Sequence, residues 1–426
     1  MDNILKDLQA LVAINSVSKR SDCREMPFGE GANQALETAL SICEGYGFRV
    51  KNCNHMTGYA EVGEGQPLIG ILVHLDIVPA GDGWKSSPFE LRIEDGKIFG
   101  RGVTDDKGPA VAVIHAIKEL IEEGCVFNHR VRMIFGLAEE TGDWDDMEYY
   151  KATEEQISYG FTPDADFPAI YAEMGIANAS FTFDRKKTCF THIEGGNAVN
   201  MVPDKCTAEY IEGERAVICS ETGKSAHGST PWDGENAICA LMAHLTDRED
   251  CQLSRFFKEC IGTAYNGKAL GGYASDKESG EITYNFGLIH TEDDEITLTV
   301  DIRYPVTYQI GNILDGVRKH LEERGFGDVQ VKLLSDVPYA FLDKESDVMM
   351  KLLEAYREHT GDMTPPAVIG GGTYARAMKG IVAFGPMLPG RELTEHQPNE
   401  YILQEDLSLA KEIYKTAIRK LAVKGE

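Results

Sequence analysis

Two polar side chains close one of the most apolar stretches of the chain. His74 and Asp76 directly follow the run at residues 68–73 and are separated by one residue. On an extended strand, residues two apart lie on the same face. A histidine that binds a metal commonly donates its other ring nitrogen to a carboxylate, which fixes its tautomer. The pair predicts a metal-ligating imidazole oriented by Asp76, although a hydrogen-bonded histidine beside a surface aspartate would give the same pattern.

Two more acidic residues stand in a glycine-rich segment. Asp105 and Asp106 lie between Gly102 and Gly108, just ahead of a predicted helix at 110–123. A carboxylate in such a place can reach two cations, one through each oxygen. The helix dipole would equally favour an acidic N-cap here. The segment therefore predicts either a bridging ligand or a helix cap.

A pair of glutamates follows a second apolar run. Glu139 and Glu140 come directly after the predicted strand at 131–137. Neighbouring glutamates can divide the chemistry of hydrolysis, because one can bind a metal while the other accepts a proton from water. An ordinary charged strand end is the alternative interpretation.

The remaining candidates come from two loops. Asp164 and Asp166 lie between prolines, which stiffen the chain, and His396 follows a predicted strand at 380–385. Each residue alone is weak evidence. Together with the earlier residues they supply two histidines and several carboxylates, which is the ligand set of a pair of zinc ions. Two metals about 3.5–4 Å apart also need one bridging carboxylate.

The hydrophobic pattern places these residues at strand ends, where active sites of open α/β sheets lie. Strand, helix and strand follow one another in the first part of the chain, which predicts an α/β layer. The pattern of predicted elements changes near residue 177, where several strands and two helices follow over about 160 residues, a size typical of a domain. We predict a catalytic domain in two parts, 1–176 and 339–426, with an inserted domain at 177–338. The other predicted elements are helices at 2–14, 33–46, 236–245, 308–324, 346–359 and 404–423, and strands within 67–79 and at 177–185, 205–211, 281–289 and 296–303.

Composition excludes several classes of function. The 426 residues suffice for two or three domains, and the net charge is −27. Such an acidic chain is a poor partner for nucleic acid or anionic lipid. It has no run of about 20 apolar residues and no signal-peptide pattern at its start. The ten cysteines form no Cys-x-x-Cys pair and are expected to be reduced thiols. We therefore expect a cytoplasmic protein with a small-molecule partner.

At these residues the sequence resembles a known group of enzymes. It is similar to the di-zinc aminoacylase, carnosinase and succinyl-diaminopimelate desuccinylase superfamily of metallopeptidases, and most similar to its bacterial dipeptidase V (Xaa-His dipeptidase) branch. The resemblance runs over nearly the whole chain. The motifs that carry it are HLDIVP (74–79), GRGVTDDKGP (100–109), EET (139–141), GFTPDADFP (160–168), VNMVPD (199–204), GKSAHGSTP (223–231), DIRYPV (301–306), GGGTYAR (370–376) and FGPMLPGRELTEHQPNEY (384–401).

The resemblance implies a fold and a metal site. It implies a mixed-sheet α/β catalytic domain with helices on both faces, and an inserted α/β lid domain. It assigns metal ligation to His74, Asp105, Glu140, Asp164 and His396. The Asp105 carboxylate is expected to bridge two Zn²⁺ ions, and the Asp105–Asp106 peptide bond is expected to be cis. Manganese or cobalt would suit the same ligands.

The resemblance also implies how a free dipeptide is cleaved. Glu139 is the expected general base, and Asp76 orients His74. In the lid, His227 is expected to support the oxyanion, Asn200 to contact the substrate and Arg303 to bind its terminal carboxylate, after lid closure. An arginine suits that role because its fork matches a carboxylate.

Two departures and two rivals remain. Ala138 stands where many relatives carry an acidic residue, and the loop at 142–144 is spaced differently, which leaves substrate preference open. An amidohydrolase acting on N-acyl amino acids, or an aminopeptidase, would use the same site. A peptide-binding protein without catalysis is the rival from another class. From the resemblance to the dipeptidase V branch we expect a monomer.

Overall fold

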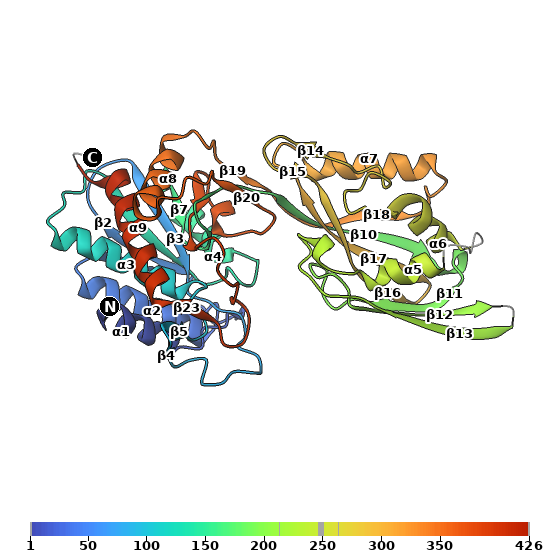
Figure 1. Ribbon diagram of the computed structural model, residues 1–426, viewed down its shortest axis with the longest axis horizontal. Coiled ribbons are helices and arrows are strands. Elements are labelled where there is room, and N and C mark those ends of the chain that lie inside the picture. Colours follow the sequence, from blue (N-terminus) through green and yellow to red (C-terminus); the bar gives the residue numbers. More distant parts are fainter. Residues whose placement is uncertain (1, 213, 246–250, 263, 425–426) are drawn as a thin grey trace. The chain divides into compact units, whose positions relative to one another are not determined.

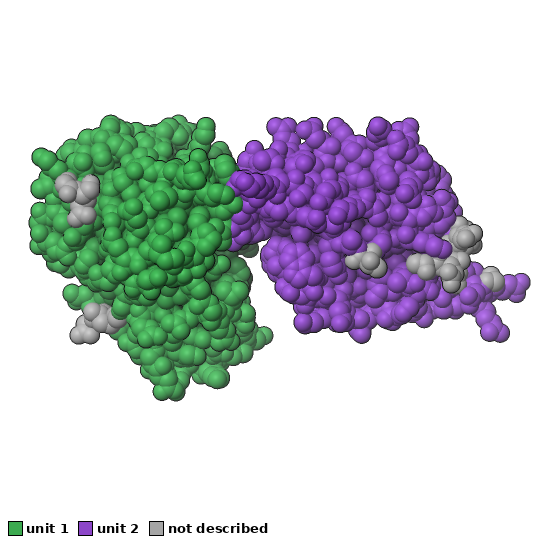
Figure 2. All heavy atoms as spheres, turned by 45° about the horizontal axis from the view of Figure 1, so that its top comes forward, with its two compact units in different colours: residues 1–171, 341–367, 373–426 green, residues 172–340, 368–372 purple. Residues whose placement is uncertain are grey.

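The computed structural model describes residues 2–212, 214–245, 251–262 and 264–424 (Figure 1). The chain divides into two compact units (Figure 2). Unit 1 comprises Met1–Tyr171, Phe341–Ala367 and Thr373–Glu426, and unit 2 comprises Ala172–Ala340 and Val368–Gly372. Within the described residues, no helix combines the length and the apolar character needed to cross a membrane.

A nine-stranded mixed sheet organises unit 1. Its centre is four parallel neighbours, β6 (Arg130–Gly136), β3 (Leu68–His74), β7 (Tyr159–Thr162) and β21 (Ile381–Ala383). All seven residues of β3 are buried, so both of its faces are covered. This explains its continuous apolar run. The strands outside this centre are β1 (Arg49–Cys53), β2 (Thr57–Val62), β9 (Ile170–Glu173), β19 (Ala340–Phe341) and β20 (Ala367–Ile369).

Helices with apolar stripes cover this sheet. The helix α3 (Lys107–Glu122) is buried over most of its length and packs against α9 (Gln404–Ala422), α1 (Asp2–Val12) and β3. The remaining helices are α2 (Glu30–Gly45), α4 (Asp145–Thr153) and α8 (Asp347–Thr360). Short strands and a 3-10 turn complete the unit: β4 (Arg92–Glu94), β5 (Lys97–Phe99), β8 (Ala165–Asp166), β22 (Pro386–Met387), β23 (Tyr401–Leu403) and Tyr374–Arg376.

Unit 2 is built on a seven-stranded antiparallel sheet. Its order is β13 (Arg215–Thr222), β12 (Lys205–Glu212), β11 (Phe190–Gly195), β16 (Thr283–Glu292), β17 (Glu295–Tyr304), β10 (Gly175–Asp184) and β18 (Gln330–Val337). The side chains that alternate onto one face form an apolar core with α5 (Ala237–His244), α6 (Gln252–Phe256) and α7 (Ile310–Glu323). Minor elements are β14 (Ser275–Asp276), β15 (Gly280–Glu281), the 3-10 turns Arg185–Lys187 and Pro231–Asp233, and the π turn Phe257–Ile261.

The predicted fold class is confirmed, because unit 1 is a mixed α/β sheet with helices and unit 2 is a second α/β unit. The predicted helices and strands are present with shifted ends. The helix predicted at 110–123 begins instead at Lys107. Pro109 therefore lies in its first turn, where a missing N–H costs no helical hydrogen bond.

Candidate metal centre

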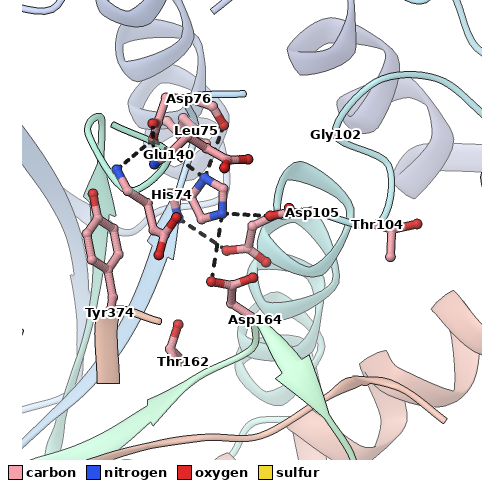
Figure 3. A network of polar contacts seen from close by, with 12 residues as sticks. His74, Leu75, Asp76, Gly102, Thr104, Asp105, Glu140, Thr162, Asp164 and Tyr374 are labelled. Carbon is pink, nitrogen blue, oxygen red and sulfur yellow. Dashed lines mark hydrogen bonds and ion pairs between the residues drawn. The ribbon is translucent and has the colours of Figure 1, made fainter. Parts of the chain in front are cut away.

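The parallel centre of the unit 1 sheet gathers the candidate residues at one edge. His74 is the last residue of β3, Glu139 and Glu140 follow β6, and Asp164 follows β7. Because parallel strands end at the same edge, these side chains converge there. Asp105 joins them from the turn that precedes α3 (Figure 3).

The first cluster is formed by His74, Asp105 and Asp164. The His74 Nε2 atom lies 2.8 Å from Asp105 Oδ1 and 3.8 Å from Asp164 Oδ2. One donor atom from each residue lies within 4.8 Å of the other two. All three therefore point at one small volume (Figure 3).

The second cluster shares Asp105 with the first. Asp105 Oδ2 lies 2.9 Å from His396 Nε2, which lies 3.2 Å from the Glu140 carboxylate. Asp105 therefore directs one oxygen toward each histidine. The peptide bond between Asp105 and Asp106 is cis, as the resemblance implies.

These donor sets fit divalent cations. Zinc binds nitrogen and oxygen at about 2.0–2.2 Å, so two ligands of a tetrahedral ion are about 3.4 Å apart. The observed spacings of 2.8–3.8 Å bracket that value. Two nitrogens and three carboxylates are also the ligand types that zinc, manganese and cobalt accept.

The electrostatics of the site favour positive charge. Burial, and then repulsion from Asp164, raise the pKa of Glu139 well above its usual range. Burial raises the pKa of Asp164 to about 7, together with the charges of Asp105 and Glu140. Hydrogen bonds with Asp105 and Glu140 raise the pKa of His396 to about 11. Divalent cations would relieve this crowding of carboxylates.

Asp76 organises two parts of the site at once. Its carbonyl oxygen lies 3.0 Å from His74 Nδ1, while its carboxylate is 3.5 Å from that nitrogen. The carboxylate oxygens accept the main-chain N–H groups of Glu139 at 3.3 Å and Glu140 at 3.0 Å. The sequence predicted that the Asp76 carboxylate would orient His74, and the nearer atom to that ring is the Asp76 main-chain oxygen. The contacts with Glu139 and Glu140 depend on β3 and β6 being neighbours in the sheet.

A buried glutamate that the sequence did not single out supports Asp105. Glu400 accepts N–H groups from Gly102 at 3.1 Å and Thr104 at 2.9 Å, and its other oxygen lies 2.7 Å from Arg101 Nη1. Arg101 and Glu400 side chains are both 1% exposed. They fix the turn that carries Asp105. The only sequence signal was an acidic residue close to His396.

A second unforeseen network supports the residues after β6. Asp146 Oδ2 accepts N–H groups from Leu137 at 2.6 Å and Ala138 at 3.1 Å, and the Tyr374 hydroxyl at 2.5 Å. The Tyr374 ring also meets the edge of the His74 ring, with centroids 6.2 Å apart. Asp146 therefore places a carboxylate against the main chain of Ala138, the position at which the resemblance led us to expect an acidic side chain in many relatives.

The three predicted substrate residues lie together in unit 2. The Gly228 N–H donates to Asn200 O at 2.7 Å, and Met201 pairs with His227 in an isolated bridge. Arg303 is bound to Asp301, whose carboxylate lies against Gly228. By contrast, Asp166 is exposed and joins neither metal cluster.

Fold and site together define a class, the α/β proteins with a double histidine–carboxylate centre at the carboxyl edge of a mixed sheet. The sequence matches peptidase family M20/M25/M40 over residues 70–420. The chain belongs to this family. It is 34% identical to a Staphylococcus aureus (strain USA300) protein named "Putative dipeptidase", over 99% of this chain and 97% of that protein.

Solved structures share the fold at low sequence identity. Human carnosine dipeptidase 1 superposes with a TM-score of 0.61 at 16% identity, covering 99% of this chain and 96% of that one. Aminoacylhistidine dipeptidase from Vibrio alginolyticus gives a TM-score of 0.61 at 12% identity, with 99% and 97% covered. Both similarities concern the whole length of the chain.

Proposed function

We propose that this protein is a metallodipeptidase that hydrolyses free dipeptides with two zinc ions. The observation that carries the proposal is Asp105, which directs one oxygen to 2.8 Å from His74 and the other to 2.9 Å from His396. A carboxylate shared in this way between two ligand clusters is what a two-metal centre needs. Membership of a peptidase family and relatives named as dipeptidases support the same conclusion.

The metal ligands would be His74, Asp105 and Asp164 on one side and Asp105, Glu140 and His396 on the other. Bound divalent ions supply Lewis acidity at the scissile carbonyl and lower the pKa of the attacking water. Glu139 accepts the proton of that water and later delivers it to the leaving amine.

Other side chains would orient the reaction. Asp76 fixes the main chain of Glu139 and Glu140 through two N–H contacts. In unit 2, His227 would donate a hydrogen bond to the oxyanion, and such preorganised donors are often the largest catalytic contribution. Asn200 would contact the substrate, and Arg303 would bind its terminal carboxylate. We further propose that the catalytic domain spans 1–176 and 339–426, that the protein is monomeric, and that it acts in the cytoplasm.

A metal-restoration assay tests the proposal. The protein is stripped with a chelator, zinc, manganese or cobalt is added singly, and cleavage of dipeptides, tripeptides and N-acetyl or N-succinyl amino acids is followed. We expect metal to restore cleavage of dipeptides, with β-Ala-His included in the panel. Restored cleavage confined to N-acyl amino acids would identify an amidohydrolase. A metal-loaded protein that hydrolyses none of these compounds would contradict catalysis altogether.

A further inference from the structure

An ion pair is buried on the face of the unit 2 sheet that lies opposite its apolar core. In β17, Val300 and Ile302 belong to the core, whereas Asp301 and Arg303 point to the other face. Asp301 is nevertheless 1% exposed and Arg303 4% exposed. Burying charge is costly unless it is paired. Replacing a buried ion pair with apolar side chains is often neutral or stabilising, so packing alone does not explain these two charges.

The contacts of Arg303 leave part of its guanidinium available. Its Nε and Nη2 atoms donate to Asp301 Oδ2 at 3.0 and 2.9 Å, and Nη1 donates to Gly370 O at 2.6 Å. A guanidinium has five N–H donors. Two of them therefore have no acceptor among the residues that the structure describes. Asp301 holds one edge of the guanidinium, and the remaining donors can serve a ligand.

The same carboxylate borders the chain next to His227. A Cβ atom built on Gly228 would lie 2.7 Å from Asp301 Oδ2 and 2.8 Å from Asn200 O. The main chain at 228 therefore packs directly on the carboxylate. Burial raises the pKa of Asp301, while the charges of Arg303 and His227 act in the opposite direction. Asp301 thus lies between the Arg303 side chain and the main chain next to His227.

The strand next to Asp301 holds the segment that contains Asn200. Asn285 in β16 is its partner across the ladder. The Asn285 Nδ2 atom donates to Val199 O at 2.9 Å and Met201 O at 2.8 Å, on either side of Asn200. Asn285 thus attaches the segment that contains Asn200 to the strand beside Asp301. Asn285 and Asp301 together therefore contact the main chain around Asn200, the main chain next to His227 and the Arg303 side chain.

We propose that Asp301 is a positioning residue, whose carboxylate sets the Arg303 guanidinium and the main chain beside His227 for recognition of a substrate carboxylate. The inference rests on the proposed function, in which Arg303 binds the C-terminal carboxylate of a dipeptide. Asp301 itself touches no substrate. Its effect should therefore appear only with ligands that carry the carboxylate.

The test measures binding separately from turnover. Zinc-loaded protein carrying Glu139→Gln, whose turnover should be about 10²- to 10⁴-fold lower, is titrated by calorimetry with Ala-Ala and with its C-terminal amide. Adding Asp301→Asn should weaken binding of Ala-Ala about tenfold, because an amide cannot hold Nε and Nη2 with a full charge. Binding of the amide should change less than about twofold, since it lacks the carboxylate that Arg303 recognises.

Two further variants guard against misfolding and against a general effect of altering β17. Asp301→Glu keeps the charge but displaces it, and should show the same selective loss. Thr299→Val alters a buried polar residue on the same face of β17 and should leave both affinities unchanged. Equal weakening of both ligands, or no weakening, would overturn the role of Asp301. Undetectable binding of Ala-Ala before Asp301 is changed would overturn it too, whereas a wild-type protein that binds Ala-Ala but cleaves no dipeptide contradicts only the proposed function.

Discussion

Replacing Glu400 with glutamine should loosen the turn that carries Asp105. The carboxylate faces Arg101 at 2.7 Å in a site where both side chains are 1% exposed. Breaking a buried ion pair costs about 3–5 kcal/mol. Glutamine keeps one oxygen for the N–H groups of Gly102 and Thr104, so we expect the lower end, about 3 kcal/mol of unfolding free energy. Affinity for zinc should fall about 10- to 100-fold, as it does when residues that orient metal ligands are changed.

Urea unfolding and zinc titration measure these two effects. Tryptophan fluorescence reports mainly on unit 1, because Trp84 and Trp144 lie there, whereas Trp232 of unit 2 is 58% exposed. The Trp84 ring centroid lies 5.3 Å from the Arg101 guanidinium carbon. With a urea slope of about 2–3 kcal/mol per M, the midpoint should fall by about 1 M. Measurements at pH 8 keep Glu400 ionised, since burial and the charge of Asp105 raise its pKa to about 7.

The matched control is Glu405→Gln, which removes an exposed ion pair with Arg391 at 3.2 Å. Such a pair is worth about 0–1 kcal/mol, so the midpoint should hardly move. If Glu400→Gln unfolded at the wild-type urea concentration and bound zinc with wild-type affinity, the positioning argument for Glu400 would be refuted.

Three other predictions follow from the structure. Glu139→Gln should reduce dipeptide turnover about 10²- to 10⁴-fold while zinc binding persists; full turnover with bound zinc would exclude Glu139 as the base. Gly136→Ala should destabilise unit 1 by about 1–3 kcal/mol, because its Cβ would lie 2.2–2.6 Å from buried ring atoms of Tyr374; an unchanged urea midpoint would contradict this. Burial lowers the pKa of His115 despite its 2.8 Å contact with Asp7, so the stability it contributes is present above its unfolded pKa of about 6.5. That contribution is lost as the pH falls through the lower folded value, and His115→Gln should flatten the pH dependence of the urea midpoint between pH 7.5 and 5.

Local sequence pattern predicted the elements whose burial is strong. The continuous apolar run before His74 predicted a strand covered on both faces, and β3 is such a strand. Some of the missed strands lack that signal. β1 is polar and largely exposed, so it carries no apolar run or period to detect. Its place in the sheet depends on pairing with its neighbour rather than on its own composition.

The sequence also predicted a metal centre, because it places two histidines and several carboxylates at predicted strand ends and in adjoining loops. The roles of individual residues in that centre remain proposals. The sequence could not reveal which supporting residues hold the ligands. Glu400 reaches a turn almost 300 residues earlier in the chain, and a contact of that separation has no local pattern.

The sequence by itself determined the layered α/β class, the candidate ligands and the approximate elements, because these depend on residue type and on short-range periodicity. Only the tertiary structure decided which atoms meet. The two oxygens of Asp105 lie next to different histidines, and the Asp76 carboxylate accepts main-chain N–H groups after β6. The Asp301 carboxylate contacts Arg303 and lies against Gly228. Such contacts arise when strands distant in sequence become neighbours, so their geometry is fixed by the packing of the whole unit rather than by any one segment.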